Sequence, residues 1–176
     1  MEDACRMDPR RVDAPVRAVS PAPFRYFLRV RYAECDAQKV VFNSRYAEYV
    51  DVGLNEFLRA AGVHDQFVTG PLDFQLVKQT VEWKAPARFD QVLELSIAPV
   101  HLGNTSFTFR TEFRIAGIEP VVVTVLTVYV LVDAKTLMKL PIPDPVRKAF
   151  SEGAAGVTVD HAGLQDRSST GVQFRG

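Results

Sequence analysis

The sequence is poor in cysteine and histidine, and this limits the metal and redox chemistry open to it. Two cysteines are present, Cys5 and Cys35, and Cys5 lies in a stretch without a structural pattern. They provide neither a disulfide framework nor a cysteine-rich zinc site, so we expect both thiols to be reduced. The histidines His64, His101 and His161 are far apart and lack the i, i+4 companion of a helical metal motif. We therefore predict no metal and no other cofactor.

The chain also lacks an excess of charge of either sign. Its 21 basic and 21 acidic residues cancel, so electrostatics gives no reason to expect nucleic acid or an anionic membrane as a partner. The longest apolar run, VVVTVLTVYVLV at 121–132, has about half the length of a membrane-spanning helix and the β-branched residues of a strand. Residues 1–23 contain no apolar core of a signal peptide. These absences predict a cytoplasmic protein with no membrane partner.

The composition is that of an ordinary globular domain, with 47% hydrophobic and 24% charged residues. Residues 1–23 mix Pro, Ala, Arg and Asp without a period, which predicts a flexible N-terminal arm. Residues 24–152 carry all the clear periodic patterns and are predicted to form one domain. Residues 153–176 are rich in Gly, Ser and Asp and are predicted to form a flexible C-terminal tail.

One long amphipathic helix is predicted over residues 43–61. Apolar residues recur there every three or four positions, with charged residues on the opposite side. Asn43 or Ser44 can cap its N-terminus, and Gly62 suits the left-handed position that follows a helix end. Gly53 inside the helix costs about 1 kcal/mol relative to alanine, and a close approach to a sheet is one reason to tolerate that cost.

The other predicted elements are strands, identified by alternating or continuous apolar residues between turn signals. They lie at 24–32, 72–84, 92–100, 104–115 and 121–132, and a short helix follows at 144–152. The 121–132 strand has no polar face, so we expect it near the middle of the sheet or in a subunit interface. The order of strand, long helix and four strands predicts an α+β fold in which one antiparallel sheet curls around one helix.

Asp36 is the leading candidate for chemistry because of its position. It follows the first strand in a short polar loop, seven residues before Asn43. A helix N-terminus presents unpaired N–H groups and a partial positive charge, which stabilise an oxyanion. A carboxylate nearby can act as a nucleophile or as a general base for water. The alternative is an aspartate that hydrogen-bonds its own loop in an Asx-turn. Glu34, two residues earlier, is interpreted as a solvated carboxylate.

The segment RYAECDAQKVVFNSRYAEYVD, at 31–51, resembles the active-site signature of hotdog-fold acyl-CoA thioesterases of the 4-hydroxybenzoyl-CoA thioesterase type. Asp36, Val41, Phe42 and Tyr46 fall on that signature. Weaker similarity extends through WKAPARFDQ, LGNTSFTF and KLPIPDPVRKAF, so the resemblance covers about residues 24–150. It implies the hotdog fold, an antiparallel five-stranded sheet wrapped around one long central helix.

The resemblance also implies roles for particular residues. The catalytic carboxylate is Asp36, and the amide at Asn43 polarises the thioester carbonyl. The substrate-contacting positions are Val41, Phe42 and Tyr46, together with Thr105 and Ser106, which follow the turn at 103–104. The implied reaction is hydrolysis of an acyl-CoA substrate by a homodimer or homotetramer, with the substrate at the dimer interface and no cofactor.

Lys39 departs from the pattern because the family usually has glycine there. If that glycine has a positive φ, lysine is strained by about 1 kcal/mol or more. Lys39 is interpreted either as a solvated surface residue or as a contact for a CoA phosphate. The departure also leaves open a non-catalytic acyl-CoA-binding module. An enoyl-thioester hydratase is disfavoured, because it pairs an Asp with a His about five residues on and position 41 is Val.

Overall fold

The computed structural model describes residues 22–164, and residues 1–21 and 165–176 lie outside the described part. Most of the predicted N-terminal arm (1–23) and half of the predicted C-terminal tail (153–176) therefore fall outside it. The strands are β1 (Phe24–Arg29), β2 (Leu72–Trp83), β3 (Val92–Leu102), β4 (Ser106–Ile115), β5 (Val121–Asp133) and β6 (Thr158–Asp160). The helices are α1 (Arg45–Ala60), α2 (His64–Val68) and α3 (Asp144–Glu152), with a single 3-10 turn at Tyr32–Glu34.

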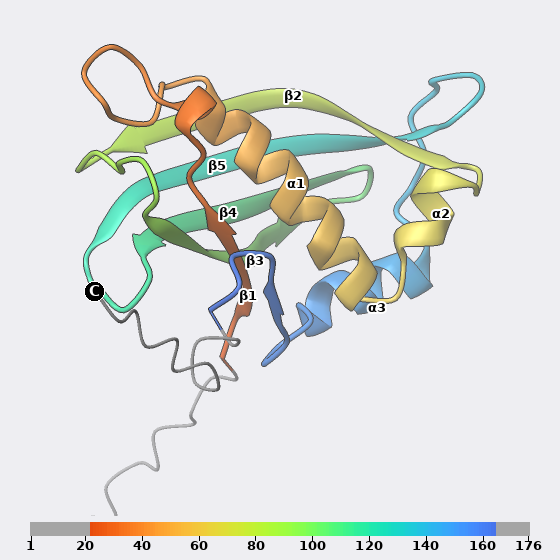
Figure 1. Cartoon of the computed structure of the whole chain (residues 1–176). Helices are drawn as coiled ribbons and strands as arrows, with labels where there is room; N and C mark the ends of the chain where they lie inside the picture. Colours follow the sequence, from red (N-terminus) through yellow and green to blue (C-terminus); the bar gives the residue numbers. More distant parts are fainter. Residues whose placement is uncertain (1–21, 165–176) are drawn as a thin grey trace, which may run out of the picture.

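The strands form one sheet in the order β2-β5-β4-β3-β1-β6, with α1 lying across one face (Figure 1). The five long strands pair antiparallel as predicted, and the hotdog arrangement is confirmed. The predicted count of five strands is one short, because β6 adds to the edge of β1 in parallel, with Arg25 opposite Thr158. A three-residue strand held by main-chain pairing carries no alternating side-chain pattern by which the sequence could reveal it.

Helix α1 begins at Arg45, two residues later than predicted, with Ser44 as its N-cap. Its buried face packs on the sheet, and Gly53 lies where the two come closest. A Cβ atom on Gly53 would stand 2.8 Å from Ile97 Cδ1 and 3.2 Å from Leu95 Cδ2. The close approach suggested by the sequence is therefore present. Gly62 has a φ of 71°, which is the left-handed geometry expected after the helix.

The core lies between α1 and the inner face of the sheet and is closed at one end by α3. Phe57 of α1 stands 5.0 Å, ring to ring, from Phe109 of β4. Phe150 of α3 lies 5.0 Å from Phe107 and 5.3 Å from Phe109 in edge-on contacts. Such contacts contribute about 0.5–1.5 kcal/mol each beyond burial of area. The apolar strand β5 lies between β2 and β4, inside the sheet as predicted.

Strand β2 forms an edge of the sheet and exposes apolar side chains. Leu76, Val77 and Trp83 are 50%, 56% and 51% exposed. A long, apolar, unpaired edge is a template for pairing with another chain. No helix in the described part of the chain is long and apolar enough to cross a membrane.

Candidate functional site

The loop between β1 and α1 is held in place by main-chain bonds on both sides. Cys35 and Val41 form an isolated antiparallel bridge, and Val40 forms another with Arg88. The Val41 amide donates to the Ala87 carbonyl at 2.8 Å. The Asp36 amide donates to the Val40 carbonyl at 2.9 Å and closes the loop. The candidate carboxylate therefore lies on a fixed turn.

The Asp36 side chain forms the Asx-turn that was the alternative interpretation. Its Oδ1 accepts the Gln38 amide at 2.8 Å and the Val40 amide at 3.4 Å. Within residues 22–164 its second oxygen, Oδ2, accepts no hydrogen bond. The side chain lines a pocket of about 500 Å³ together with Tyr32 and Phe89. The turn thus holds one oxygen and leaves Oδ2 without a hydrogen bond among residues 22–164, so the Asx-turn does not conflict with the catalytic interpretation.

Lys39 occupies the left-handed region with a φ of 63°, as expected if the glycine usual at this position has a positive φ. Its amide donates to the Asp36 carbonyl at 2.9 Å, which completes the turn. A Cβ atom in this region costs about 1–2 kcal/mol. The lysine side chain is exposed and lines the same pocket as Asp36.

We expect Lys39→Gly to raise the free energy of unfolding by about 1 kcal/mol relative to Lys39→Ala. Both variants remove the lysine side chain, but only glycine relieves the positive φ. Chemical denaturation of the pair measures the difference. Equal stability of the two variants would show that the turn is not strained at this position.

Asn43, Val41 and Tyr46 line a second, smaller pocket of about 270 Å³ between the loop and the end of β2, which Trp83 also lines. Within the described residues, the Asn43 main-chain N–H donates no hydrogen bond. The bonds at the start of the helix are donated by the Arg45 and Ala47 amides. An unpaired amide beside a helix N-terminus is suited to bind a carbonyl oxygen. The structure places these three residues together.

The two aromatic residues of the signature differ in burial. Phe42 is 52% exposed, and Tyr46 is 1% exposed. The Tyr46 ring packs edge-on against Phe113 at 5.3 Å, and burial raises the pKa of its phenol. Tyr46 is thus mainly a core residue with one side on the Asn43 pocket.

Thr105 and Ser106 lie at the opposite end of the sheet. Ser106 is opposite Val130 of β5, whereas Trp83, beside the Asn43 pocket, is opposite Val123. Seven residues of strand separate those two positions, which is roughly 20 Å. Within one chain, Thr105 and Ser106 therefore do not join the residues of the Asn43 pocket, and Asp36 lines a separate pocket on the same loop.

Glu34 is not the solvated carboxylate that the sequence suggested. It is 5% exposed and lies at the end of the 3-10 turn. Its carboxylate accepts the Tyr49 hydroxyl at 2.8 Å, the Arg31 amide at 2.7 Å and the Arg31 Nε at 2.8 Å. Its carbonyl accepts the Phe42 amide at 2.9 Å. Glu34 thus links the loop to α1 through Tyr49. The sequence held no local pattern that predicts this contact, because the two residues are fifteen positions apart and lie in different elements.

The electrostatics of Glu34 follow from these bonds. Burial by itself raises the pKa of the carboxyl group, but the bonds from the Arg31 amide, the Tyr49 hydroxyl and the Arg31 guanidinium outweigh it, so the pKa lies below its usual value. The same arrangement raises the pKa of the Tyr49 phenol, through burial first and then through its bond to Glu34. The pair is therefore an ionised carboxylate that accepts from a neutral tyrosine.

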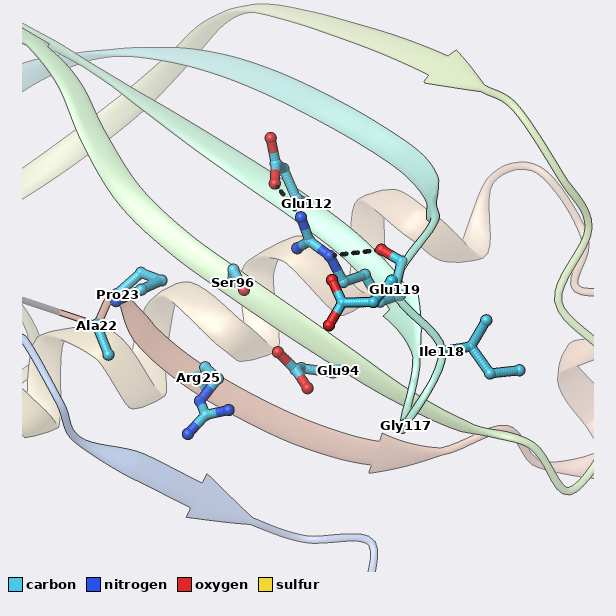
Figure 2. A pocket seen from close by; sticks show the side chains of 10 residues that line it. Ala22, Pro23, Arg25, Glu94, Ser96, Glu112, Gly117, Ile118 and Glu119 are labelled. Atoms are coloured by element: carbon cyan, nitrogen blue, oxygen red, sulfur yellow. Dashed lines mark hydrogen bonds and ion pairs between the residues drawn. The ribbon is translucent and has the colours of Figure 1, made fainter. Parts of the chain in front are cut away.

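A further pocket, of about 430 Å³, lies on the outer face of the sheet, away from α1 (Figure 2). Half of its ten lining residues are charged, and Arg114 and Glu112 among them form an ion pair. Arg114 donates to Glu112 at 2.8 Å and to the Glu119 carbonyl at 3.2 Å. None of the predicted site residues lines this pocket, so it is not the candidate site. No group of three metal-binding side chains occurs among residues 22–164.

Comparison with curated proteins gives relatives that match about half of the chain. A putative esterase of Aquifex aeolicus is 34% identical over 88 residues, which is 49% of this chain and 69% of that protein. The acyl-CoA thioester hydrolase YbgC of Escherichia coli is 33% identical over 87 residues, covering 49% of this chain and 65% of that protein. The matched segment thus spans about two thirds of each relative.

Solved structures match over a longer segment. A hypothetical protein from Aquifex aeolicus superposes with a TM-score of 0.68 and 28% identity, covering 73% of this chain and 99% of that one. The gentisyl-coenzyme A thioesterase BH1999 superposes with a TM-score of 0.64 and 26% identity, covering 72% and 98%. The model of the Thioesterase-like superfamily matches residues 30–150. These matches confirm the resemblance carried by the loop and helix residues, and the chain belongs to the Thioesterase-like superfamily.

Proposed function

We propose that this chain is a thioester hydrolase that cleaves an acyl-CoA into a carboxylic acid and free CoA. The observation that carries the proposal is a fixed carboxylate, Asp36, with one oxygen free, on the loop that leads to the unpaired amide of Asn43. The family membership and the relatives named as acyl-CoA thioester hydrolases support the same reaction.

In the proposed mechanism the thioester oxygen accepts from the Asn43 amide near the start of α1. The negative charge that develops on this oxygen is stabilised there by the N–H and by the helix dipole. Asp36 Oδ2 then either attacks the carbonyl carbon or takes a proton from a water that attacks it. The C–S bond breaks, and CoA leaves as a thiolate that gains a proton. If Asp36 attacks, the acyl group is held on it as an anhydride, which water then hydrolyses to the acid and free Asp36. If Asp36 activates water, that water supplies the OH of the acid directly.

Release of free CoA thiol from a panel of short, long, branched and aryl acyl-CoAs tests this proposal. Turnover of at least one member is expected. The rival proposal of a non-catalytic acyl-CoA-binding module, which rests on Lys39, predicts tight binding of acyl-CoA without thiol release. If no acyl-CoA in the panel releases CoA, the hydrolase is refuted. Tight binding of acyl-CoA without release would then favour the binding module.

We also propose that two copies pair along β2. The exposed apolar side chains of this edge, Leu76, Val77 and Trp83, would be covered by a second copy. A two-fold axis beside β2 runs the two strands antiparallel. The Thr105–Ser106 end of one sheet then approaches the Asn43 end of the other. The interface would thus bring together site residues that one chain holds roughly 20 Å apart.

Light scattering tests the pairing, because a dimer or a tetramer has two or four times the 19.6 kDa of one chain. A molar mass of one chain at micromolar concentration would contradict the paired site. A cytoplasmic location remains a prediction from the sequence.

A further inference from the structure

Residues 156–164 form a strap along the edge of β1 opposite β3. The strap contains β6, which pairs with β1 in parallel (Figure 1). Its main chain is bonded to β1 over the length of the strand, and the His161 amide donates to the Phe27 carbonyl at 3.0 Å. The strap lies beyond the segment 30–150 that the superfamily model matches. Its contribution must therefore be sought in its own contacts.

The end of the strap is a tight turn built on the Asp160 side chain. The Oδ1 atom accepts the Ala162 amide at 2.8 Å and the Gly163 amide at 3.1 Å. The Oδ2 atom accepts the Leu164 amide at 2.8 Å. These bonds fix the direction of the main chain, so the Ala162 carbonyl is held toward the end of β1. There it accepts a hydrogen bond from Arg29 Nη2 at 3.1 Å.

The Arg29 guanidinium joins the strap to a second turn, at residues 87–91. Its Nη1 donates to the Asp90 carbonyl at 2.9 Å and to the Asp90 carboxylate at 3.3 Å. Asp90 has a φ of 65°, in a region that residues other than glycine rarely occupy. The guanidinium is a planar fork of fixed geometry, and its bonds are charge-assisted. One side chain therefore fixes the strap and the turn relative to each other.

The 87–91 turn also supports the loop that carries Asp36. Arg88 pairs with Val40. The Val40 carbonyl accepts the Asp36 amide at 2.9 Å, and the Val40 amide donates to Asp36 Oδ1 at 3.4 Å. Phe89, from the same turn, lines the Asp36 pocket. A displacement of the turn would therefore reach the carboxylate through a continuous series of contacts.

We propose that Arg29 is a positioning residue for Asp36 and that the strap holds Arg29 in place. The Asp160 turn presents the carbonyl that accepts from Arg29. The guanidinium in turn fixes Asp90, and with it the turn against which the Asp36 loop is paired. Attack on a thioester needs the carboxylate in a narrow range of positions, so a small displacement slows the reaction even when the substrate still binds. The inference rests on the thioesterase function proposed above.

The rate of CoA release by Arg29→Ala tests the inference with the best acyl-CoA of the panel. We expect kcat to fall by about tenfold to a hundredfold while KM stays nearly unchanged. Arg114→Ala is the matched control. Arg114 also bridges a carboxylate and a main-chain carbonyl, those of Glu112 and Glu119, and lies on the outer face of the sheet. Its side chain is 25% exposed and that of Arg29 is 28% exposed. The control should keep the wild-type kcat.

Asp160→Ala tests the strap without a change to the arginine. It should lower kcat by about threefold to tenfold, because the turn that presents the Ala162 carbonyl is lost. Asp160→Asn should keep most of the wild-type kcat, since an amide oxygen can still accept the Ala162 and Gly163 amides. The double variant of Asp160→Ala and Arg29→Ala should have the kcat of Arg29→Ala alone, because both changes break one series of contacts. Effects that multiply would show that the strap does not act through Arg29.

Amide hydrogen exchange measures the position of the loop without any need for activity. Arg29→Ala should raise the exchange of residues 36–41 by about tenfold and leave β4 and β5 at their wild-type rates. A general loss of stability would raise exchange throughout the sheet instead. A wild-type kcat in Arg29→Ala, or exchange of 36–41 no faster than in Arg114→Ala, would overturn the inference and leave the thioesterase standing. If the wild type releases CoA from no acyl-CoA of the panel, the proposed function fails, and exchange alone decides whether Arg29 positions the loop.

Discussion

Asp36→Asn is expected to lower the rate of CoA release by about two to four orders of magnitude, which is the usual contribution of a positioned acid or base. The fold should be nearly unaffected. An asparagine oxygen can still accept the Gln38 and Val40 amides, so the Asx-turn is retained. The substitution removes the charge and the nucleophile while it keeps the shape of the loop. The measurement is kcat with the best acyl-CoA from the panel.

Asp36→Ala separates the two roles of this side chain. It removes the turn as well as the charge, so it should lose activity to a similar degree and also lose about 1 kcal/mol of stability. Denaturation curves of the two variants, measured beside the wild type, give this difference. An Asp36→Asn enzyme that keeps near-wild-type turnover on its best substrate would remove Asp36 from the mechanism.

The sequence was sufficient to predict the fold because its elements are long and strongly periodic. The α1 helix and the apolar strand β5 repeat their patterns over many residues, and Gly53 and Gly62 have the geometry that their positions suggested. Strand β6 was missed because three residues paired through main-chain atoms leave no periodic trace. Local patterns thus predict long helices and strands. A short strand such as β6, added at a sheet edge, depends instead on the edge that the rest of the fold leaves open.

Among the candidate site residues, proximity in the fold was predictable only where they are close in sequence. Asn43, Val41 and Tyr46 come together because a tight loop leads into a helix. The burial of Glu34 was not predictable, because it depends on a contact with Tyr49 in a separate element. Periodicity predicts which face of an element is buried, but not which polar group on that face finds a partner.

Glu34→Ala is expected to lower the free energy of unfolding by about 2–3 kcal/mol at neutral pH. The change leaves the Tyr49 hydroxyl buried without its acceptor and removes the acceptor of the Arg31 amide. The ion pair with Arg31 adds little, because that guanidinium is 80% exposed. Tyr49→Phe is the matched control. It removes one donor and keeps the ring, so it should cost less, about 1 kcal/mol.

The contribution of Glu34 to stability should also depend on pH in a defined direction. Its pKa is lower in the folded chain than in the unfolded chain, where the ordinary value is 4.5. The stabilisation is therefore complete above about pH 5 and is lost as the pH falls through the lower, folded pKa. The difference in unfolding free energy between wild type and Glu34→Gln should accordingly be constant from pH 8 to about pH 5 and then shrink. A difference that grows on acidification would mean that the buried carboxyl group is protonated in the native protein, and that Tyr49 is not donating to a carboxylate.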